Sequence, residues 1–173
     1  MGGFAIHRSI PLTQGKVAWV DQADYADIVQ FKWHAEKPGR RDVFYASRGV
    51  GHGRGNRRIE KMHRRILGLS PGDGLQVDHI NGDGIDNRRR NLRVCTHAEN
   101  HANLPPYGGV SRFKGVSWYA RHERWVASIH PRGDCIHLGY FDNEESAAHA
   151  YDRAAAIHFG GFARLNFPKE AAL

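Results

Sequence analysis

Short apolar runs alternate with polar and turn residues over the first third of the chain, a pattern typical of strands separated by turns. Asp21 stands where it would cap a short helix that ends at Ile28. Apolar residues at helical spacing from Ile59 to Leu69 predict a further helix. A glycine and a proline mark its end. The predicted strands cover residues 5–12, 16–20, 31–35 and 43–47.

Glycine and proline interrupt this pattern at two places. Glycine fills every second position from 49 to 55, so this segment is predicted to be a mobile basic loop and not a core element. Prolines and glycines between 105 and 109 predict the end of a helix and a linker over 105–110. We therefore expect a β-rich N-terminal region over 1–58, a second module over 59–104 and a third over 111–168.

The third module has the pattern of a small sheet with one helix. Three short apolar runs joined by turns predict strands at 115–119, 124–130 and 136–140. Asp142 and Glu145 have the spacing of a capping box, and an alanine-rich helix is expected to follow them. Since alanines allow a helix to lie close to a sheet, we expect a three-stranded antiparallel sheet packed on one helix, and an α+β fold class for the chain.

The charge of the chain points to a polyanionic partner. Its 173 residues carry a formal net charge of +7, and the pI is near 9.7, although a basic protein without such a partner would also fit. Residues 1–110 contain 17 Lys and Arg against 11 Asp and Glu, whereas residues 111–173 contain 8 against 7. We expect arginines of the first part to contact DNA phosphates. They are Arg54, Arg57, Arg58, Arg64, Arg88, Arg89 and Arg90.

Several classes of protein are disfavoured. Cys95 and Cys135 are too few for a four-cysteine zinc site or a disulfide framework, so a metal would be bound by oxygen and imidazole. No apolar run approaches the roughly 20 residues of a membrane span, and the first residues lack a signal-peptide core. We therefore expect a cytoplasmic protein with no membrane partner. We also expect it to be a monomer.

The segment 77–103 carries the strongest chemical signal. Asp78 and His79 come first, Asn91 follows twelve residues after the histidine, and Asn100 follows nine residues later. A neutral imidazole can take a proton from water near pH 7, which makes His79 the candidate general base. Carboxylate and amide oxygens suit Mg²⁺ or Mn²⁺, so Asp78 and Asn100 are the candidate metal ligands. Asn91 is expected to tie the hairpin loop together through hydrogen bonds to the backbone.

Residues 77–83 and the two asparagines resemble the HNH motif of phage and intron-encoded homing endonucleases. The resemblance implies a ββα-metal nuclease fold for the second module, with His79 as general base and Asn91 as the structural middle residue of the catalytic set. It also implies that Asp78 and Asn100 bind the metal. The last position of the motif is an asparagine here and not a histidine, a variant of the homing branch.

His63 precedes the motif, in a stretch that resembles the lead-in helix of the same family. We interpret it as a packing or hydrogen-bonding residue and not as a catalytic one. The family resemblance further implies a phage-encoded or bacterial host protein.

Residues 111–167 resemble the plant APETALA and ethylene-response-factor type of DNA-binding domain, which lays a three-stranded sheet in the major groove. The resemblance implies double-stranded DNA as the partner. Most of the arginines with which the plant domains read guanine are absent, so no base preference is implied. Arg121 and Arg124 are the first candidates for base contacts. The residues expected to face DNA are Lys114, Ser117, Trp118, Tyr119, Arg121, Arg124, Ser128, His130 and His137.

The function expected from these features is metal-dependent hydrolysis of DNA phosphodiester bonds, at sites that the C-terminal sheet selects. An Asp-His pair alone is usually structural, and Asn-Gly-Asp-Gly turns are common without a metal, so the joint spacing carries the argument. The alternative is a DNA-binding protein with an inactive HNH fold, which the intact motif residues disfavour. A zinc-stabilised structural module is a third reading, which the missing cysteine pairs disfavour.

Overall fold

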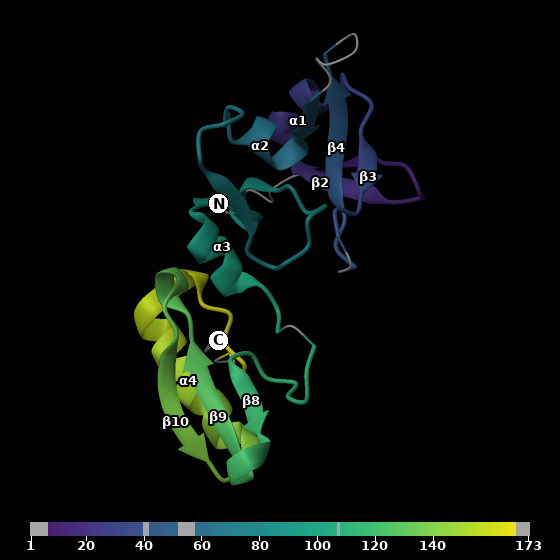
Figure 1. Cartoon of the computed structure of the whole chain (residues 1–173). Coiled ribbons are helices and arrows are strands. Elements are labelled where there is room, and N and C mark those ends of the chain that lie inside the picture. The colour runs from purple at the N-terminus through teal and green to yellow at the C-terminus, as the bar shows by residue number, and fades with distance from the viewer. Residues whose placement is uncertain (1–6, 40–41, 52–57, 107, 169–173) are drawn as a thin grey trace, which may run out of the picture. The chain divides into compact units, whose positions relative to one another are not determined.

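The computed structural model describes residues 7–39, 42–51, 58–106 and 108–168 (Figure 1). The chain divides into two compact units, Met1–Cys95 and Thr96–Leu173. Small antiparallel sheets and a few helices make up both units, which confirms the mixed α+β class. Within the described residues, no helix is long and apolar enough to cross a membrane.

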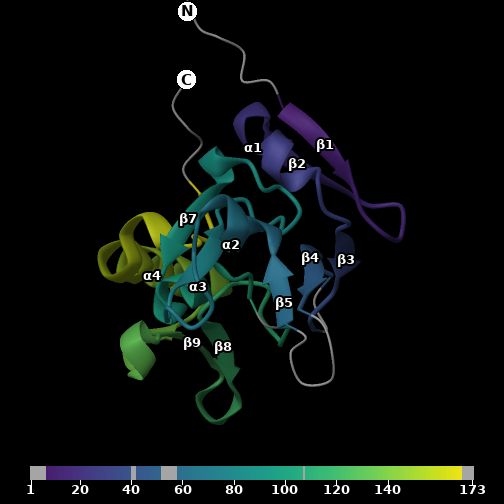
Figure 2. The same ribbon diagram turned by 90° about the horizontal axis from the view of Figure 1, so that it is seen from above.

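Three small sheets form the first unit. They have the strand orders β1-β2, β3-β4-β5 and β6-β7, and Figure 2 shows β3, β4 and β5 side by side. One core lies beneath them, which includes the fully buried Val20, Ile28 and Met62. The elements are β1 (His7–Pro11), β2 (Val17–Asp21), α1 (Gln22–Ile28), β3 (His34–Glu36), β4 (Tyr45–Val50), β5 (Arg58–Lys61), α2 (Met62–Ile66), β6 (Gln76–His79), η1 (Arg89–Asn91) and β7 (Leu92–Cys95).

The helix predicted from Ile59 to Leu69 is wrong at its start. Residues up to Lys61 belong to β5, which pairs with β4 in a register that sets Ser47 opposite Lys61. Only Met62–Ile66 is helical, because backbone pairing with β4 overrides the apolar spacing of the earlier residues. The strand β4 also continues to Val50, into the segment predicted to be a loop, while most of that loop lies outside the described residues.

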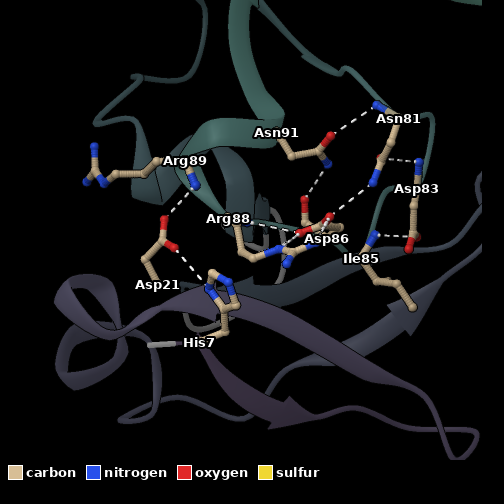
Figure 3. Close-up of polar contacts among 9 residues, drawn as sticks. All are labelled: His7, Asp21, Asn81, Asp83, Ile85, Asp86, Arg88, Arg89 and Asn91. Carbon is tan, nitrogen blue, oxygen red and sulfur yellow. Dashed lines mark hydrogen bonds and ion pairs between the residues drawn. The ribbon is translucent and has the colours of Figure 1, made fainter. Parts of the chain in front are cut away.

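Asp21 stands at the N-terminus of α1 as expected, but its side chain does not cap the helix. Its carboxylate instead lies 3.4 Å from Nδ1 of His7 and accepts a 2.8 Å hydrogen bond from the backbone N–H of Arg89 (Figure 3). The carboxylate therefore links the N-terminal strands to the short helix η1.

The second unit consists of a helix, a three-stranded sheet and a longer helix. The strand order is β10-β9-β8, all antiparallel, and α4 packs against the sheet through alanines such as Ala147 and Ala150. The elements are α3 (His97–Asn103), β8 (Val116–Tyr119), η2 (Ala120–His122), β9 (Arg124–Ile129), η3 (Pro131–Gly133), β10 (Ile136–Phe141), α4 (Glu144–Phe159) and η4 (Gly160–Phe162). The helix α3, which the sequence placed in the second module, groups with this unit.

Both helices of this unit have side-chain N-caps. Thr96 and Glu99 form a reciprocal capping box at α3. The capping box expected from Asp142 and Glu145 is wrong, because Asn143 is the N-cap of α4 and accepts a 2.7 Å hydrogen bond from the backbone of Ser146. The carboxylate of Asp142 pairs with Arg124 instead.

The close approach of Gly115 to Tyr151 allows the packing of α4 in the second unit to be tested. A Cβ at Gly115 would lie 1.9 Å from the Tyr151 ring, and the backbone has φ +74°. We expect Gly115→Ala to destabilise the second unit by at least about 2 kcal/mol, from overpacking and left-handed backbone strain together. Thermal unfolding measures the loss. Gly133→Ala is the matched control, since it has φ +97° but an open environment, and it should cost less. Equal losses in the two variants would contradict the packing argument.

Candidate active site

The hairpin of β6 and β7 carries the Asp-His pair. Its register sets Asp78 opposite Arg93 and His79 opposite Leu92. Both residues of the pair are buried, with 4% and 5% of their surface exposed. A buried carboxylate needs a positive partner, and Arg93 supplies it through Nε and a terminal nitrogen, 2.7 and 2.6 Å from Oδ2 of Asp78.

The loop between these strands is held by the side chain of Asn91, as Figure 3 shows. Its Oδ1 accepts a 3.0 Å hydrogen bond from the backbone N–H of Asn81, and its Nδ2 donates a 2.8 Å bond to the carbonyl oxygen of Asp86. The buried carboxylate of Asp86 in turn accepts hydrogen bonds from Asn81 and Arg88. Asn91 therefore ties both the start and the middle of the loop to the residue that precedes β7.

The loop is also joined to the N-terminal sheet. The backbone N–H of Trp19 donates to the carbonyl oxygen of Ile85 at 2.9 Å, and the carbonyl oxygen of Trp19 accepts from Asn87 at 2.8 Å. The strand β2 thus continues its pairing onto the loop. The N-terminal strands, to which the sequence assigned no role, support the loop that follows His79.

Two aromatic side chains surround the imidazole of His79. The ring of His63 on α2 lies at 5.0 Å between centroids, and the ring of Tyr45 on β4 lies at 5.7 Å. The sequence predicts a packing or hydrogen-bonding role for His63, and its ring is buried and packs against the candidate base. Tyr45 carries no sequence signal, because its contact with His79 depends on the tertiary packing of β4.

Burial lowers the pKa of His79 below its usual value. The side chain of Asn87, which is fully buried, and the carboxylates of Asp78, Asp83 and Asp86 act in the opposite direction without cancelling this effect. Burial and the neighbouring His79 also lower the pKa of His63. Both imidazoles are therefore neutral at pH 7, which is the state that a general base requires.

The donor chemistry of the motif suits a hard divalent cation. Asp78 offers a carboxylate and Asn100, on α3 in the second unit, offers an amide oxygen, and such oxygen ligands suit Mg²⁺ or Mn²⁺. Across the part of the chain that the structure describes, His, Cys, Asp and Glu side chains form no group of three that could hold a metal ion. A closed zinc site is therefore not built from these residues.

Several arginines assigned to DNA instead bind protein groups of the first unit. Arg64 donates to the carbonyl oxygens of Ser70 and Leu75 and to the carboxylate of Asp73. Arg88 is bound to Asp86, and Arg89 binds Asp24 and the carbonyl oxygen of Ile66. Arg89 stays exposed despite these contacts, two further arginines at the start of β5 and in η1 are also exposed, and two others lie outside the described residues. The exposed pair is Arg58 and Arg90, and the undescribed pair is Arg54 and Arg57.

The sheet of the second unit presents aromatic and polar side chains on the face away from α4. The register places Tyr119 opposite Arg124, and Tyr140 opposite Val126, on this outer face. The rings of Tyr119 and Tyr140 lie 5.9 Å apart, and His122 stacks on Tyr119 at 5.1 Å. The exposed residues on or beside this face are Ser117, Tyr119, Arg121, His122, Arg124, His130, His137 and Tyr140.

Two of the residues expected to face DNA make other contacts in the structure, although Trp118 stays 40% exposed. The ammonium of Lys114 donates to the carbonyl oxygens of His101, Ala102 and Leu104 at the end of α3, so a DNA contact would require it to leave that helix. Trp118 pairs with Trp125 on the side of the sheet that α4 covers, at 5.1 Å between rings. Arg124 lies on the outer face, but it is engaged by Asp142.

These features define the class of protein. The HNH endonuclease family model matches residues 61–102, which contain α2, β6, β7 and most of α3, and the chain belongs to this family. Protein 3.8 of Escherichia phage T7 is 32% identical over 93 residues, which cover 53% of this chain and 76% of that protein.

The chain is also similar to plant transcription factors of the AP2-like class. An AP2-like ethylene-responsive transcription factor of Arabidopsis thaliana is 34% identical over 89 residues, 44% of this chain and 21% of the relative. APETALA2-like protein 2 of Oryza sativa subsp. indica is 42% identical over 62 residues, 36% of this chain and 14% of the relative. The matches therefore span about a fifth or less of these plant relatives.

The side chain of Asn91 offers a test of the loop. We expect Asn91→Ala to lower the free energy of unfolding by about 1–3 kcal/mol, because it leaves the Asn81 N–H and the Asp86 carbonyl without their partner. Chemical denaturation of the full chain measures this loss. Asp83→Ala, which removes an exposed carboxylate of the same loop, should cost less. If both variants were as stable as the wild type, Asn91 would not hold the loop.

Proposed function

We propose that the protein is a metal-dependent DNA endonuclease that hydrolyses phosphodiester bonds at sites selected by its second unit. The observation that carries the proposal is the buried Asp78-His79 pair on a hairpin whose loop Asn91 closes, inside the region that matches the HNH endonuclease family. The AP2-like similarity and the net charge of +7 support DNA as the partner.

In this proposal His79 accepts a proton from the attacking water. Its lowered pKa keeps the imidazole neutral at pH 7, so the base is available without prior deprotonation. The β6–β7 pairing holds the backbone of His79, and the rings of His63 and Tyr45 pack against its imidazole. Asn91 acts on the shape of the loop and not on the reacting atoms.

Asp78 and Asn100 would hold the divalent cation. Once bound, Mg²⁺ or Mn²⁺ supplies positive charge that stabilises negative charge developing on the phosphate and the leaving oxygen. Arg93 shares the Asp78 carboxylate, so the chain compensates the charge of this ligand within the hairpin.

For DNA binding we propose two surfaces. Arg58 and Arg90 remain exposed in the first unit and suit phosphate contacts. The outer face of the β8-β9-β10 sheet suits contact with the major groove, with Arg121 at the hairpin turn as the first candidate for a base contact. Lys114 and Trp118 lie off this outer face, since Lys114 is bound at the end of α3 and Trp118 lies on the other side of the sheet.

The Asp78–Arg93 ion pair supports a second candidate, a DNA-binding protein with an inactive HNH fold. An arginine that remained on the carboxylate would compete with a cation for the same oxygen. Cleavage assays separate the two candidates, because both predict DNA binding and only one predicts a nicked or linear product.

The first test is cleavage of supercoiled plasmid by the full chain with Mg²⁺ or Mn²⁺. We expect His79→Ala to reduce the cleavage rate by roughly 10²–10⁴-fold while DNA affinity changes little, since only the proton acceptor is lost. His158→Ala, which removes an exposed histidine of α4, is the matched control. Excess EDTA should also stop cleavage. Cleavage by His79→Ala at the wild-type rate would show that His79 is not the general base. Cleavage in excess EDTA would show that no metal is required.

The second test compares two exposed arginines of the second unit. Arg121 lies in the β8–β9 turn and Arg153 lies on α4. We expect Arg121→Ala to weaken binding to cognate DNA by about 1–3 kcal/mol in fluorescence anisotropy, because a base contact is lost. Arg153→Ala removes the same charge and should weaken binding less. Equal effects of the two substitutions would show that Arg121 contributes only its charge.

A further inference from the structure

Three aromatic rings from three separate elements meet in the first unit. His63 and His79 lie edge to face, with centroids 5.0 Å apart and an interplanar angle of 77°. Tyr45 completes the group, with its centroid 5.8 Å from His63 and 5.7 Å from His79. Aromatic rings attract each other at such distances and angles. We call Tyr45, His63 and His79 the ring cluster.

The chain neighbours of His63 determine where its ring lies. Met62 is fully buried and anchors α2 in the core. Arg64 donates hydrogen bonds to the carbonyl oxygens of Ser70 and Leu75, in the segment that leads into β6. The helix that carries His63 is therefore tied to the strand that carries His79, and the two rings are held at a set separation.

A close backbone approach holds the third ring. A Cβ placed on Gly84 would lie 2.5 Å from the carbonyl oxygen of Phe44 and 2.8 Å from the Tyr45 ring. The loop after His79 thus lies directly against Tyr45, which has no room to turn toward the loop. The ring of His79 therefore packs against His63 on α2 and against Tyr45. The loop that follows His79 restrains Tyr45.

We propose that His63 is a positioning residue that holds the imidazole of His79 in the orientation needed for general-base catalysis. This inference rests on the proposed function, in which His79 is the base. Nδ1 of His63 is buried and has no hydrogen-bond partner among the described residues, so the contact depends on the shape of the ring and not on a bond through that atom. A phenylalanine ring should therefore substitute for it, whereas alanine should remove one of the two ring contacts that fix the orientation of the His79 imidazole.

Single-turnover cleavage of plasmid at saturating concentrations of the full chain with Mg²⁺ tests the proposal. A misplacement of about 1 Å can reduce a catalytic rate roughly 10²-fold, and we expect a loss of this order for His63→Ala with little change in DNA affinity. His63→Phe should recover most of the rate. Ile66→Val shortens another buried side chain of α2 and should leave the rate unchanged, which controls for destabilisation of the helix.

Imidazole NMR signals of His79 provide a readout that needs no cleavage. In His63→Ala the ring signals should shift or broaden, and in His63→Phe they should stay sharp, with thermal unfolding confirming that each variant folds. Cleavage by His63→Ala at the wild-type rate would overturn the proposal. Unchanged His79 ring signals in that variant would also overturn it. A folded His63→Phe as slow as His63→Ala would also overturn it, because the nitrogen atoms would then be needed. If the wild type itself cleaves nothing, the proposed function fails, while the NMR comparison still shows whether His63 orients the ring.

Discussion

The two hydrogen bonds of the Asn91 side chain are the interaction on which the site depends. They bind the backbone at Asn81 and at Asp86, so the start and the middle of the loop between β6 and β7 are both tied to Asn91 at its end. Without them, the N–H of Asn81 and the carbonyl oxygen of Asp86 would lack this partner, and burying such groups costs more than the bonds contribute. The loop in turn lies against Tyr45, which contacts His79.

The N-terminal sheet supports this loop from the other side. Backbone hydrogen bonds between Trp19 and the loop extend β2, and Arg89 binds Asp24 on α1. Such pairings join residues more than sixty positions apart in the chain, and no local pattern of apolar residues indicates them. The strands themselves could be predicted from alternation of apolar and polar residues, but their role as a support for the motif could not.

The motif residues could be identified from spacing alone, whereas their surroundings could not. Asp78, His79 and Asn91 lie near each other because the family spacing is local to one hairpin. His63 and Tyr45 reach the same place from α2 and β4, through contacts that depend on tertiary packing. The arginines available for DNA could not be predicted from the sequence. A count of charges cannot distinguish exposed Arg90 from an arginine that an adjacent carboxylate binds, such as Arg88.

Burial of the Asp-His pair has two opposite consequences. It lowers the pKa of His79 and so keeps the imidazole neutral, but it also removes the Asp78 carboxylate from the water that would stabilise its charge. Arg93, directly opposite on β7, compensates that charge at 2.6 Å. The compensation therefore comes from the same hairpin that carries the candidate base.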